Sequence, residues 1–271
     1  MGIKFSVIVV CYNAGDKLRD TIDSILEQTY GEYEVIVKDA SSTDNSLSKI
    51  PINDKIEIIS AKDTGIYDGM NQAVSYATGD YYVFLNCGDS FYHKDTLEDM
   101  ANFIEKKRRE IGANEKEPLI YYGDTYNESQ RSKVPMSPKI TAFTCYRHFP
   151  CHQACFYAAE LFRERKYDLH YIIRADYEHF LWCFFCKEAN PCYTDMVIAN
   201  YEGGGFSESR ENHELDKREH KEITEKYMTS KQLFRYKVIM AVTLVPVRRY
   251  LASQKWFSGI YNGVKQVLYK H

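Results

Sequence analysis

A chain of 271 residues with 44% hydrophobic and 27% charged side chains can bury a large core, which excludes an intrinsically disordered protein. The formal net charge of −3 gives no general attraction to a polyanion, so we expect no nucleic-acid partner. The longest uncharged run near the C-terminus, residues 238–247, has ten residues and contains Pro246, so it is too short to span a bilayer.

Residues 1–4 lead directly into a predicted strand, so we expect no leader peptide and a cytoplasmic protein. We therefore expect the eight cysteines to be reduced thiols. Cys183 and Cys186 have the C-x-x-C spacing of zinc ligands, but they lie in an apolar helix pattern. Cys151 and Cys155 form a poorly spaced second pair. We therefore expect buried cysteines rather than a structural zinc site.

Strand and helix patterns alternate from the start of the chain. Runs rich in β-branched and aromatic residues predict strands at 5–11, 33–37, 56–60, 81–85 and 120–126. Apolar stripes at helical spacing predict helices over 18–26 and 66–77 and within 93–112, a short capped helix after 41–44, and a loop or edge hairpin at 131–140. This alternation favours an α/β fold with a doubly wound, mostly parallel sheet flanked by helices.

The most informative stretch is 61–89. Its helix pattern runs up to Gly79, which we expect to stop the helix, and the apolar strand at 81–85 follows. That strand runs directly into the polar sequence NCGD, which ends at Asp89. Open α/β sheets bind ligands beyond the carboxyl ends of their parallel strands, and a carboxylate there suits Mg²⁺ or Mn²⁺ that also holds a phosphate. An ordinary Gly-Asp turn is the alternative interpretation.

Two further polar residues, Asn13 and Asp39, follow other predicted strands. Three polar groups at the carboxyl ends of successive strands indicate a nucleotide crevice. The chain has neither a G-x-G-x-x-G sequence after its first strand nor a G-x-x-x-x-G-K-[ST] sequence, which weighs against dinucleotide oxidoreductases and P-loop enzymes.

The segments 6–46 and 63–89, which carry these motifs in order, resemble the GT-A family 2 glycosyltransferases. The resemblance is strongest to the bacterial branch that builds capsular, exopolysaccharide and O-antigen chains. It implies a nucleotide-sugar donor with UDP as the favoured nucleotide, a Mn²⁺ or Mg²⁺ ion, and inversion at the anomeric carbon.

The resemblance also assigns roles to particular residues. Asp39 matches the acid that holds the nucleobase, and Asp89 matches the last acid of the D-x-D-type motif, the metal ligand. The other residues expected at the donor site are Tyr12, Asn13, Asp63, Gly65, Asp68, Asn71, Asn86 and Gly88. Lys38 stands where relatives often have an acid, and N-x-G-D replaces the commonest form of the metal motif. A single carboxylate suffices when diphosphate oxygens and water fill the other metal positions.

An inverting transfer needs a general base that faces the acceptor hydroxyl, opposite the departing nucleoside diphosphate. Asp176 opens the apolar helix pattern in YIIRADYEHFLWCFF, and the resemblance assigns the base to an acid in that place, with Glu178 in reserve. A helix N-cap is the alternative role for Asp176.

Two further features are expected near the sugar. His152, in FPCHQACFY, is placed at the acceptor side, with a core histidine as the alternative. The glycine-rich residues 201–209, with Gly204 and Ser207, are expected to form a lid whose amides bind the diphosphate, or else a plain linker.

The composition changes near residue 211, so we expect a catalytic domain at 1–210 and a helical extension at 211–271. The extension combines basic and aromatic residues, which favours contact with an anionic membrane surface, where a lipid-linked acceptor is found. A helical cap or a homodimer contact is the alternative.

The combined prediction is a metal-dependent glycosyltransferase, cytoplasmic or peripheral on the inner face of the membrane, with a saccharide or polyprenyl-linked acceptor. Two other functions stay open. A sugar-nucleotide nucleotidyltransferase usually has a Gly-rich loop with Arg and Lys after its first strand, and YNAGDK is a thin match to that. A non-catalytic nucleotide-sugar-binding subunit is compatible with the reduced metal motif.

Overall fold

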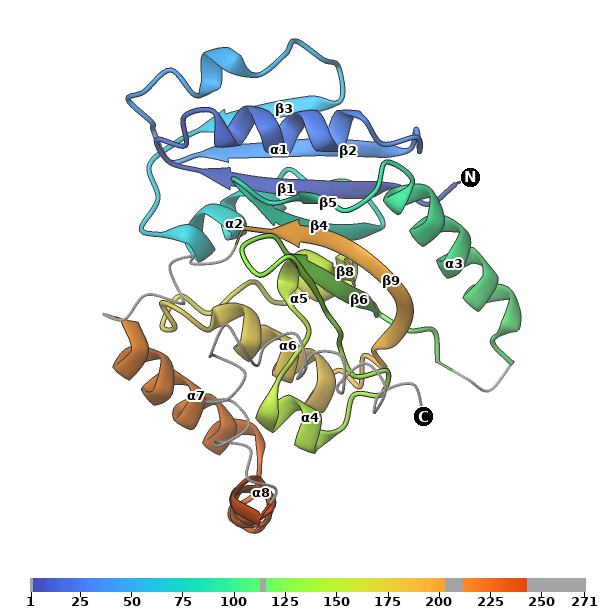
Figure 1. The fold of residues 1–271 in the computed structure, drawn as a ribbon, viewed down its shortest axis with the longest axis vertical. Helices are drawn as coiled ribbons and strands as arrows, with labels where there is room; N and C mark the ends of the chain where they lie inside the picture. Colours follow the sequence, from blue (N-terminus) through green and yellow to red (C-terminus); the bar gives the residue numbers. More distant parts are fainter. Residues whose placement is uncertain (1, 113–115, 203–211, 243–271) are drawn as a thin grey trace.

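The computed structural model describes residues 2–112, 116–202 and 212–242, which form a mixed α/β fold (Figure 1). The strands are β1 (Phe5–Cys11), β2 (Tyr33–Asp39), β3 (Ile56–Ser60), β4 (Tyr81–Asn86), β5 (Ser90–Phe91), β6 (Ile120–Asn127), β7 (Ser132–Val134), β8 (Cys155–Ala158) and β9 (Cys192–Tyr201). The α-helices are α1 (Lys17–Leu26), α2 (Ile66–Val74), α3 (Thr96–Glu110), α4 (Ala142–Arg147), α5 (Ala159–Glu164), α6 (Ala175–Phe185), α7 (His213–Tyr227) and α8 (Ser230–Val242). Two 3₁₀ turns are η1 (Leu47–Lys49) and η2 (His152–Ala154).

The described strands form one sheet in the order β3-β2-β1-β4-β8-β6-β9-β5, and β7 pairs with β6. The first four strands in this order are parallel, so their carboxyl ends meet at one edge of the sheet. In the sheet, β2 lies on one side of β1 and β4 lies on the other. The strand order therefore reverses at β1, and open sheets of this type bind ligands at such a switch point. This half of the sheet confirms the predicted α/β fold.

Beyond β4 the sheet changes direction. β8 pairs antiparallel with both β4 and β6, and β6 then pairs parallel with β9. β7 pairs antiparallel with β6, which confirms the predicted edge hairpin. The insertion of β8 beside β4 has a consequence for the site, because it brings η2, which directly precedes β8, against the carboxyl end of β4.

Helices cover both faces of the sheet, and this explains why the central strands β1 and β4 are almost entirely apolar and buried. One core contains residues from α1 and α3, and the other contains residues from α2, α5 and α6. The large tyrosine content is in part structural, since some of the largest fully buried side chains are Tyr81, Tyr82, Tyr121, Tyr122, Tyr157 and Tyr177.

One local prediction was wrong. Helix α2 ends at Val74, so Gly79 does not stop it; a Cβ atom on Gly79 would lie 2.7 Å from the backbone nitrogen of Ser6. Gly79 is therefore required by the close approach of two backbone segments. The short helix predicted after residues 41–44 is the 3₁₀ turn η1, and Asp44 Oδ1 accepts hydrogen bonds from the backbone N–H and the hydroxyl of Ser46 just before it.

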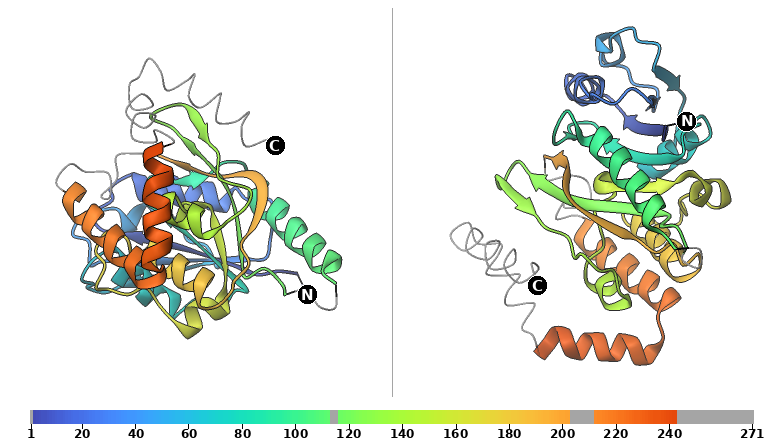
Figure 2. Two further views of the ribbon diagram at one scale, coloured as in Figure 1. Left: turned by 90° about the horizontal axis from the view of Figure 1, so that it is seen from below. Right: turned by 90° about the vertical axis from the view of Figure 1, so that its right-hand side faces the viewer.

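Helices α7 and α8 lie at the end of the molecule opposite β3 (Figures 1 and 2). Ile223, Met228, Leu233 and Tyr236 join the same core as α6. No helix among the described residues is both long enough and apolar enough to cross a membrane. All eight cysteines lie in the described part of the chain and are free thiols; Cys183 is buried and Cys186 is exposed.

Candidate active site

Two cavities lie at the carboxyl edge of the parallel strands. The first, of about 530 Å³, is called the β4 cavity here, and its lining includes Asn86, Cys87, Asp89, His152, Gln153, Arg174 and Asp176. The second, of about 700 Å³, is called the β2 cavity, and its lining includes Tyr12, Ala40, Ser41, Thr43, Asp63 and Gly65. Ile66, the first residue of α2, lines both, so the two cavities are neighbours.

Two carboxylates from distant parts of the chain face the β4 cavity, and consecutive residues of η2 contact them. Gln153 Nε2 donates to Asp89 Oδ2 at 2.8 Å. His152 Nδ1 lies 3.1 Å from Asp176 Oδ2. Successive residues of a 3₁₀ turn point in directions about 120° apart, which lets one dipeptide reach two different groups.

Asp176 is the second residue of α6 and is 8% exposed. Its Oδ1 atom accepts the backbone N–H of Tyr177 and lies 2.8 Å from the Tyr67 hydroxyl. Burial raises the pKa of Asp176, but the hydrogen bond and charge of His152 and the hydrogen bond of Tyr67 outweigh burial and lower the pKa below its usual value. The N-cap alternative is wrong, because the cap position belongs to Arg174.

The ring of His152 has a second polar partner. Asn86 Nδ2 lies 3.1 Å from His152 Nε2. This contact orients the imidazole so that Nδ1 faces Asp176. The Asn86 Oδ1 atom is buried and has no hydrogen-bond partner among the described residues.

Asp89 is 7% exposed, and burial raises its pKa despite the hydrogen bond from Gln153. A carboxylate in this state gains from a nearby cation. Asn86 lines the same cavity, and its buried, unpartnered Oδ1 is a second hard oxygen of the kind that Mg²⁺ and Mn²⁺ bind. No group of three or more His, Cys, Asp or Glu residues in the described chain could hold a metal by itself. These residues therefore fit a divalent cation that shares its coordination with a bound diphosphate.

Gly88 adopts the left-handed conformation, with φ of 96°, just before Asp89. A Cβ atom there would lie 3.2 Å from Glu202 and 3.4 Å from the Lys17 side chain, which pair with each other. Lys17 thus brings a positive charge close to the N-x-G-D turn. The sequence interpretation missed Lys17, and the only available signal was its position at the start of the first helix.

The β2 cavity is built from the loops that follow β1 and β2. Tyr12 is 64% exposed at its wall, and Asp63 and Gly65 line it as well. Asn13 braces a neighbouring loop, because its Oδ1 atom accepts the backbone N–H of Thr43 at 2.8 Å.

Asp39 is fully buried below this loop and does not line the cavity. Its Oδ2 atom accepts the Ser60 hydroxyl at 2.6 Å and the backbone N–H of Ser42 at 3.1 Å. Burial raises the pKa of Asp39, but the hydrogen bonds from Ser42 and Ser60 outweigh burial, and the net pKa is lowered. The carboxylate holds the backbone of Ser42 in place, and the flanking residues Ala40, Ser41 and Thr43 line the cavity.

Lys38 stands where the resemblance led us to expect an acid, and in the structure it is a buried cation. Its side chain is 0% exposed, and Nζ lies 3.0 Å from Asp63 Oδ2 and 2.6 Å from the Ala61 carbonyl oxygen. The ion pair therefore fixes the loop that carries Asp63 into the β2 cavity.

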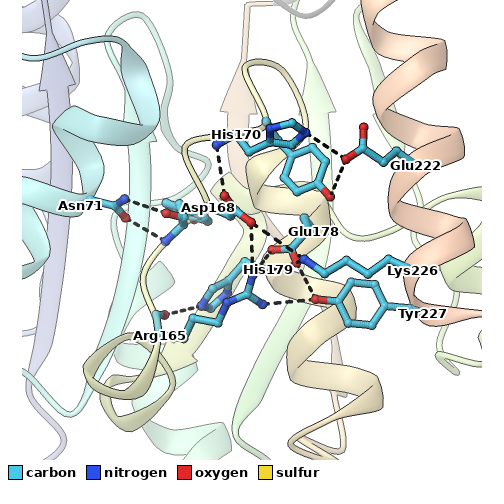
Figure 3. Close-up of polar contacts among 11 residues, drawn as sticks. Asn71, Arg165, Asp168, His170, Glu178, His179, Glu222, Lys226 and Tyr227 are labelled. Carbon is cyan, nitrogen blue, oxygen red and sulfur yellow. Dashed lines mark hydrogen bonds and ion pairs between the residues drawn. The ribbon is translucent and has the colours of Figure 1, made fainter.

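Three predicted site residues face away from both cavities and serve the fold. Asp68, in the first turn of α2, accepts the backbone N–H of Thr64 at 2.9 Å and so ties the preceding loop to the helix. Asn71 makes two 2.8 Å hydrogen bonds to the backbone of Tyr167 (Figure 3). Glu178 is buried in an ion-pair cluster with Arg165 and Lys226 (Figure 3).

The predicted lid residues Gly204 and Ser207 lie outside the described residues, as does the segment 243–271. Gln153 and Tyr67 were missed by the sequence interpretation. The H-Q pair in FPCHQACFY was the signal for Gln153, whereas nothing in the local sequence distinguished Tyr67.

Comparison with known proteins agrees with this geometry. The family model described as Glycosyl transferase family 2 matches residues 6–165. A PGL/p-HBAD biosynthesis glycosyltransferase of Mycobacterium bovis (strain BCG / Pasteur 1173P2) is 34% identical over 221 residues, which cover 79% of this chain and 83% of the relative.

Two solved structures share the fold. Mannosyltransferase PcManGT from Pyrobaculum calidifontis, in complex with GDP-Man and Mn²⁺, has a TM-score of 0.66 and 15% identity, covering 100% of this chain and 89% of that one. S. aureus TarS 1-349, in complex with UDP-GlcNAc, has a TM-score of 0.59 and 20% identity, covering 76% of this chain but only 61% of that one. The fold is therefore the GT-A fold of nucleotide-sugar-dependent glycosyltransferases. The chain belongs to glycosyl transferase family 2.

Proposed function

We propose that this chain is an inverting glycosyltransferase that moves a sugar from a nucleoside-diphosphate sugar to a hydroxyl group of a saccharide or lipid-linked acceptor. Membership of family 2 supports the reaction class. A relative named for PGL/p-HBAD biosynthesis supports a role in making a surface glycan or glycolipid. The TarS complex with UDP-GlcNAc supports UDP as the nucleotide, and the family resemblance favours the same choice.

One observation carries the proposal: Asp89 and Asp176 line the same cavity, and neighbouring residues of one turn hold them. In the proposed reaction the acceptor oxygen forms a bond to the anomeric carbon as the bond from that carbon to the diphosphate oxygen breaks. Asp176 takes the acceptor proton, and the nucleoside diphosphate leaves with the electron pair of the broken bond. The lowered pKa of Asp176 supports this role, because the base must be ionised at neutral pH.

His152 would hold the Asp176 carboxylate toward the acceptor, which gives the predicted acceptor-side residue a definite contact. The β2 cavity would take the nucleoside, with Tyr12 and Asp63 at its walls and Asp39 supporting the loop beneath. Asp89 and Asn86 would hold Mn²⁺ or Mg²⁺, which neutralises charge on the leaving diphosphate.

The C-terminal region would place the enzyme at a cytoplasmic membrane surface. On α8 the side chains of Phe234, Val238 and Val242 are 71%, 44% and 75% exposed, at a spacing that puts them on one stripe. Lys231 and Arg235 lie close to this stripe on the helix, and an apolar stripe beside basic residues suits an anionic lipid surface. A homodimer contact is the other proposed use of α8. We also propose that residue 210 divides the catalytic domain from the helical extension, whose first helix, α7, packs against α6.

The test is release of free UDP from a panel of UDP-sugars, with and without Mn²⁺ and with candidate acceptors. We expect turnover with one donor, and Asp176→Asn should lose turnover while still binding UDP. Binding of UDP by the unaltered chain without any turnover would indicate a non-catalytic subunit. Release of pyrophosphate from a nucleoside triphosphate and a sugar phosphate would indicate a nucleotidyltransferase.

A further inference from the structure

Helix α7 supplies a buried carboxylate to the backbone just before the proposed base. Glu219 is 3% exposed. Its Oε1 atom accepts the backbone N–H of Ile172 at 2.8 Å, and its Oε2 atom accepts those of Ile173 and Arg174 at 3.0 and 2.9 Å. Three consecutive amides on one carboxylate form a charge-assisted cluster, stronger than three neutral hydrogen bonds.

This contact lies just before the start of α6. Arg174 holds the cap position of α6, and its side chain makes no capping hydrogen bond in the described chain. Glu219 accepts the N–H of Arg174 and those of the two residues before it, so it places a negative charge near the positive end of the helix dipole, two residues before Asp176.

A second contact lies one turn earlier on α7. Arg174 Nε lies 2.7 Å from Asp216 Oδ1, and Arg174 Nη2 lies 2.9 Å from Asp216 Oδ2, so the guanidinium and the carboxylate form a two-point ion pair. Both residues line the β4 cavity, as do Ile172 and Ile173. One wall of the proposed active site is therefore made of, or held by, α7.

Later residues of α7 contact Tyr177 and Glu178, the two residues of α6 that follow Asp176. The His220 ring stacks on the Tyr177 ring with an interplanar angle of 2°. Lys226 Nζ lies 2.7 Å from Glu178 Oε1, within the cluster drawn in Figure 3. Asp176 is thus preceded and followed by residues that contact α7, while its own carboxylate faces the cavity.

We infer that α7 is a working part of the active site and that Glu219 is a positioning residue for Asp176. The inference rests on the proposed role of Asp176. Without Glu219, three backbone N–H groups lose their acceptor and residues 172–174 relax, which moves the start of α6. A displacement of about 1 Å at a reacting group costs about 100-fold in rate. Within the described part of the chain, the hydrogen bonds of Glu219 go to residues 172–174 and not to Tyr12, Asp63 or Asp89 on the donor side, so nucleotide binding should persist.

The test uses the full chain with Glu219→Ala and Glu219→Gln, and with Glu222→Gln as the matched control. Glu222 lies one turn further on α7, is 48% exposed, and contacts His170 rather than the 172–174 backbone (Figure 3). Readouts are kcat and KM with the active donor, the pH profile of kcat, the Kd of UDP alone, and the Tm.

We expect kcat of Glu219→Ala to fall by about 10- to 100-fold with the Kd of UDP within about twofold of wild type. Glu219→Gln should recover part of the loss, because its amide oxygen still accepts hydrogen bonds, and Glu222→Gln should match wild type. The acid limb of the kcat profile of Glu219→Ala should move to higher pH, since a displaced Asp176 loses His152.

Three results would overturn the inference: equal kcat in Glu219→Ala and Glu222→Gln, an unchanged pH profile, or a parallel loss of UDP binding and kcat in Glu219→Gln. The proposed function fails separately, if Asp176→Asn keeps full turnover.

Discussion

His152 Nδ1 lies 3.1 Å from Asp176 Oδ2, and the next residue along the chain donates a hydrogen bond to Asp89. The imidazole is itself oriented by Asn86, which lies in the same N-x-G-D turn as Asp89. The acidic groups on the two sides of the β4 cavity are therefore joined by a short path of direct polar contacts, and this connection guides the first two predictions.

The first prediction concerns His152→Ala. His152 offsets the burial that raises the pKa of Asp176, so its removal should raise that pKa. Because the base works only when ionised, activity should then be lost at a higher pH on the acid side, with kcat lower by about 10- to 100-fold at neutral pH. The measurement is kcat/KM against pH. His170→Ala is the matched control, since His170 is exposed and pairs with Glu222. An acid limb that does not move would contradict the contact described here.

The second prediction concerns Asp89→Asn. Loss of the charge should lower turnover by about 100- to 1,000-fold and abolish the response to added Mn²⁺, because a cation stabilises the leaving group. Turnover is followed in a metal titration. Asp68→Asn is the control, since the Asp68 carboxylate binds the backbone N–H of Thr64 and does not line either cavity, and it should keep the metal response. The proposed cation site would be refuted by an unchanged metal dependence in Asp89→Asn.

The third prediction tests the close approach at Gly79. A Cβ atom on this residue would meet the backbone of Ser6 at 2.7 Å and that of Lys4 at 2.8 Å, and a backbone cannot rotate away. Gly79→Ala should lower the free energy of unfolding by about 1–3 kcal/mol. Gly31→Ala is the control, because a Cβ there meets nothing within 4 Å. Urea unfolding curves measure both, and equal stabilities of the two variants would disprove the steric argument.

The fourth prediction concerns Glu178. Burial raises the pKa of Glu178, but hydrogen bonds from Lys226, Tyr227 and Arg165 outweigh burial and lower the pKa below its usual value. A carboxylate with a lowered pKa stabilises the fold above its unfolded-state pKa, and this stability is lost as the pH falls through the folded-state pKa.

Glu178→Gln should therefore be less stable than wild type by about 2–3 kcal/mol at pH 7, because it leaves cations without their partner. Its Tm should also vary less with pH on the acid side than that of wild type. Thermal unfolding between about pH 3 and pH 7 tests both points, around the ordinary carboxyl pKa. If the two proteins lose stability in parallel on acidification, Glu178 does not carry this effect.

The parallel half of the fold could be predicted because its signals are local. The strand from Phe5 to Cys11 and the helix that follows it depend on hydrophobic runs and spacings that neighbouring residues set. The predicted position of Asp89 past the end of β4 follows from the same local pattern. The apolar pattern that Asp176 opens is helix α6 in the structure.

The partners of these residues could not be predicted, because they come from far along the chain. Tyr67 and Asp176 are 109 residues apart, and their contact depends on how the chain between α2 and α6 folds back. Asn71 was expected at the donor, yet both ends of its amide bind the backbone of Tyr167. Asp39 was expected to contact the nucleobase of the donor, yet its side chain is fully buried. The residue type sets the chemical group, whereas tertiary packing determines which way the side chain faces.

The 3₁₀ geometry of η2 makes the order of its first two residues matter as much as their identity. Exchanging His152 and Gln153 would place the glutamine amide beside Asp176 and the histidine imidazole beside Asp89. The composition would be unchanged, but neither carboxylate would keep its present hydrogen-bond partner in this turn. A single-residue insertion ahead of β8 would rotate the pair by a third of a turn and have a similar outcome. The length of this short turn and the order of its residues are therefore both constrained by the two carboxylates that it contacts.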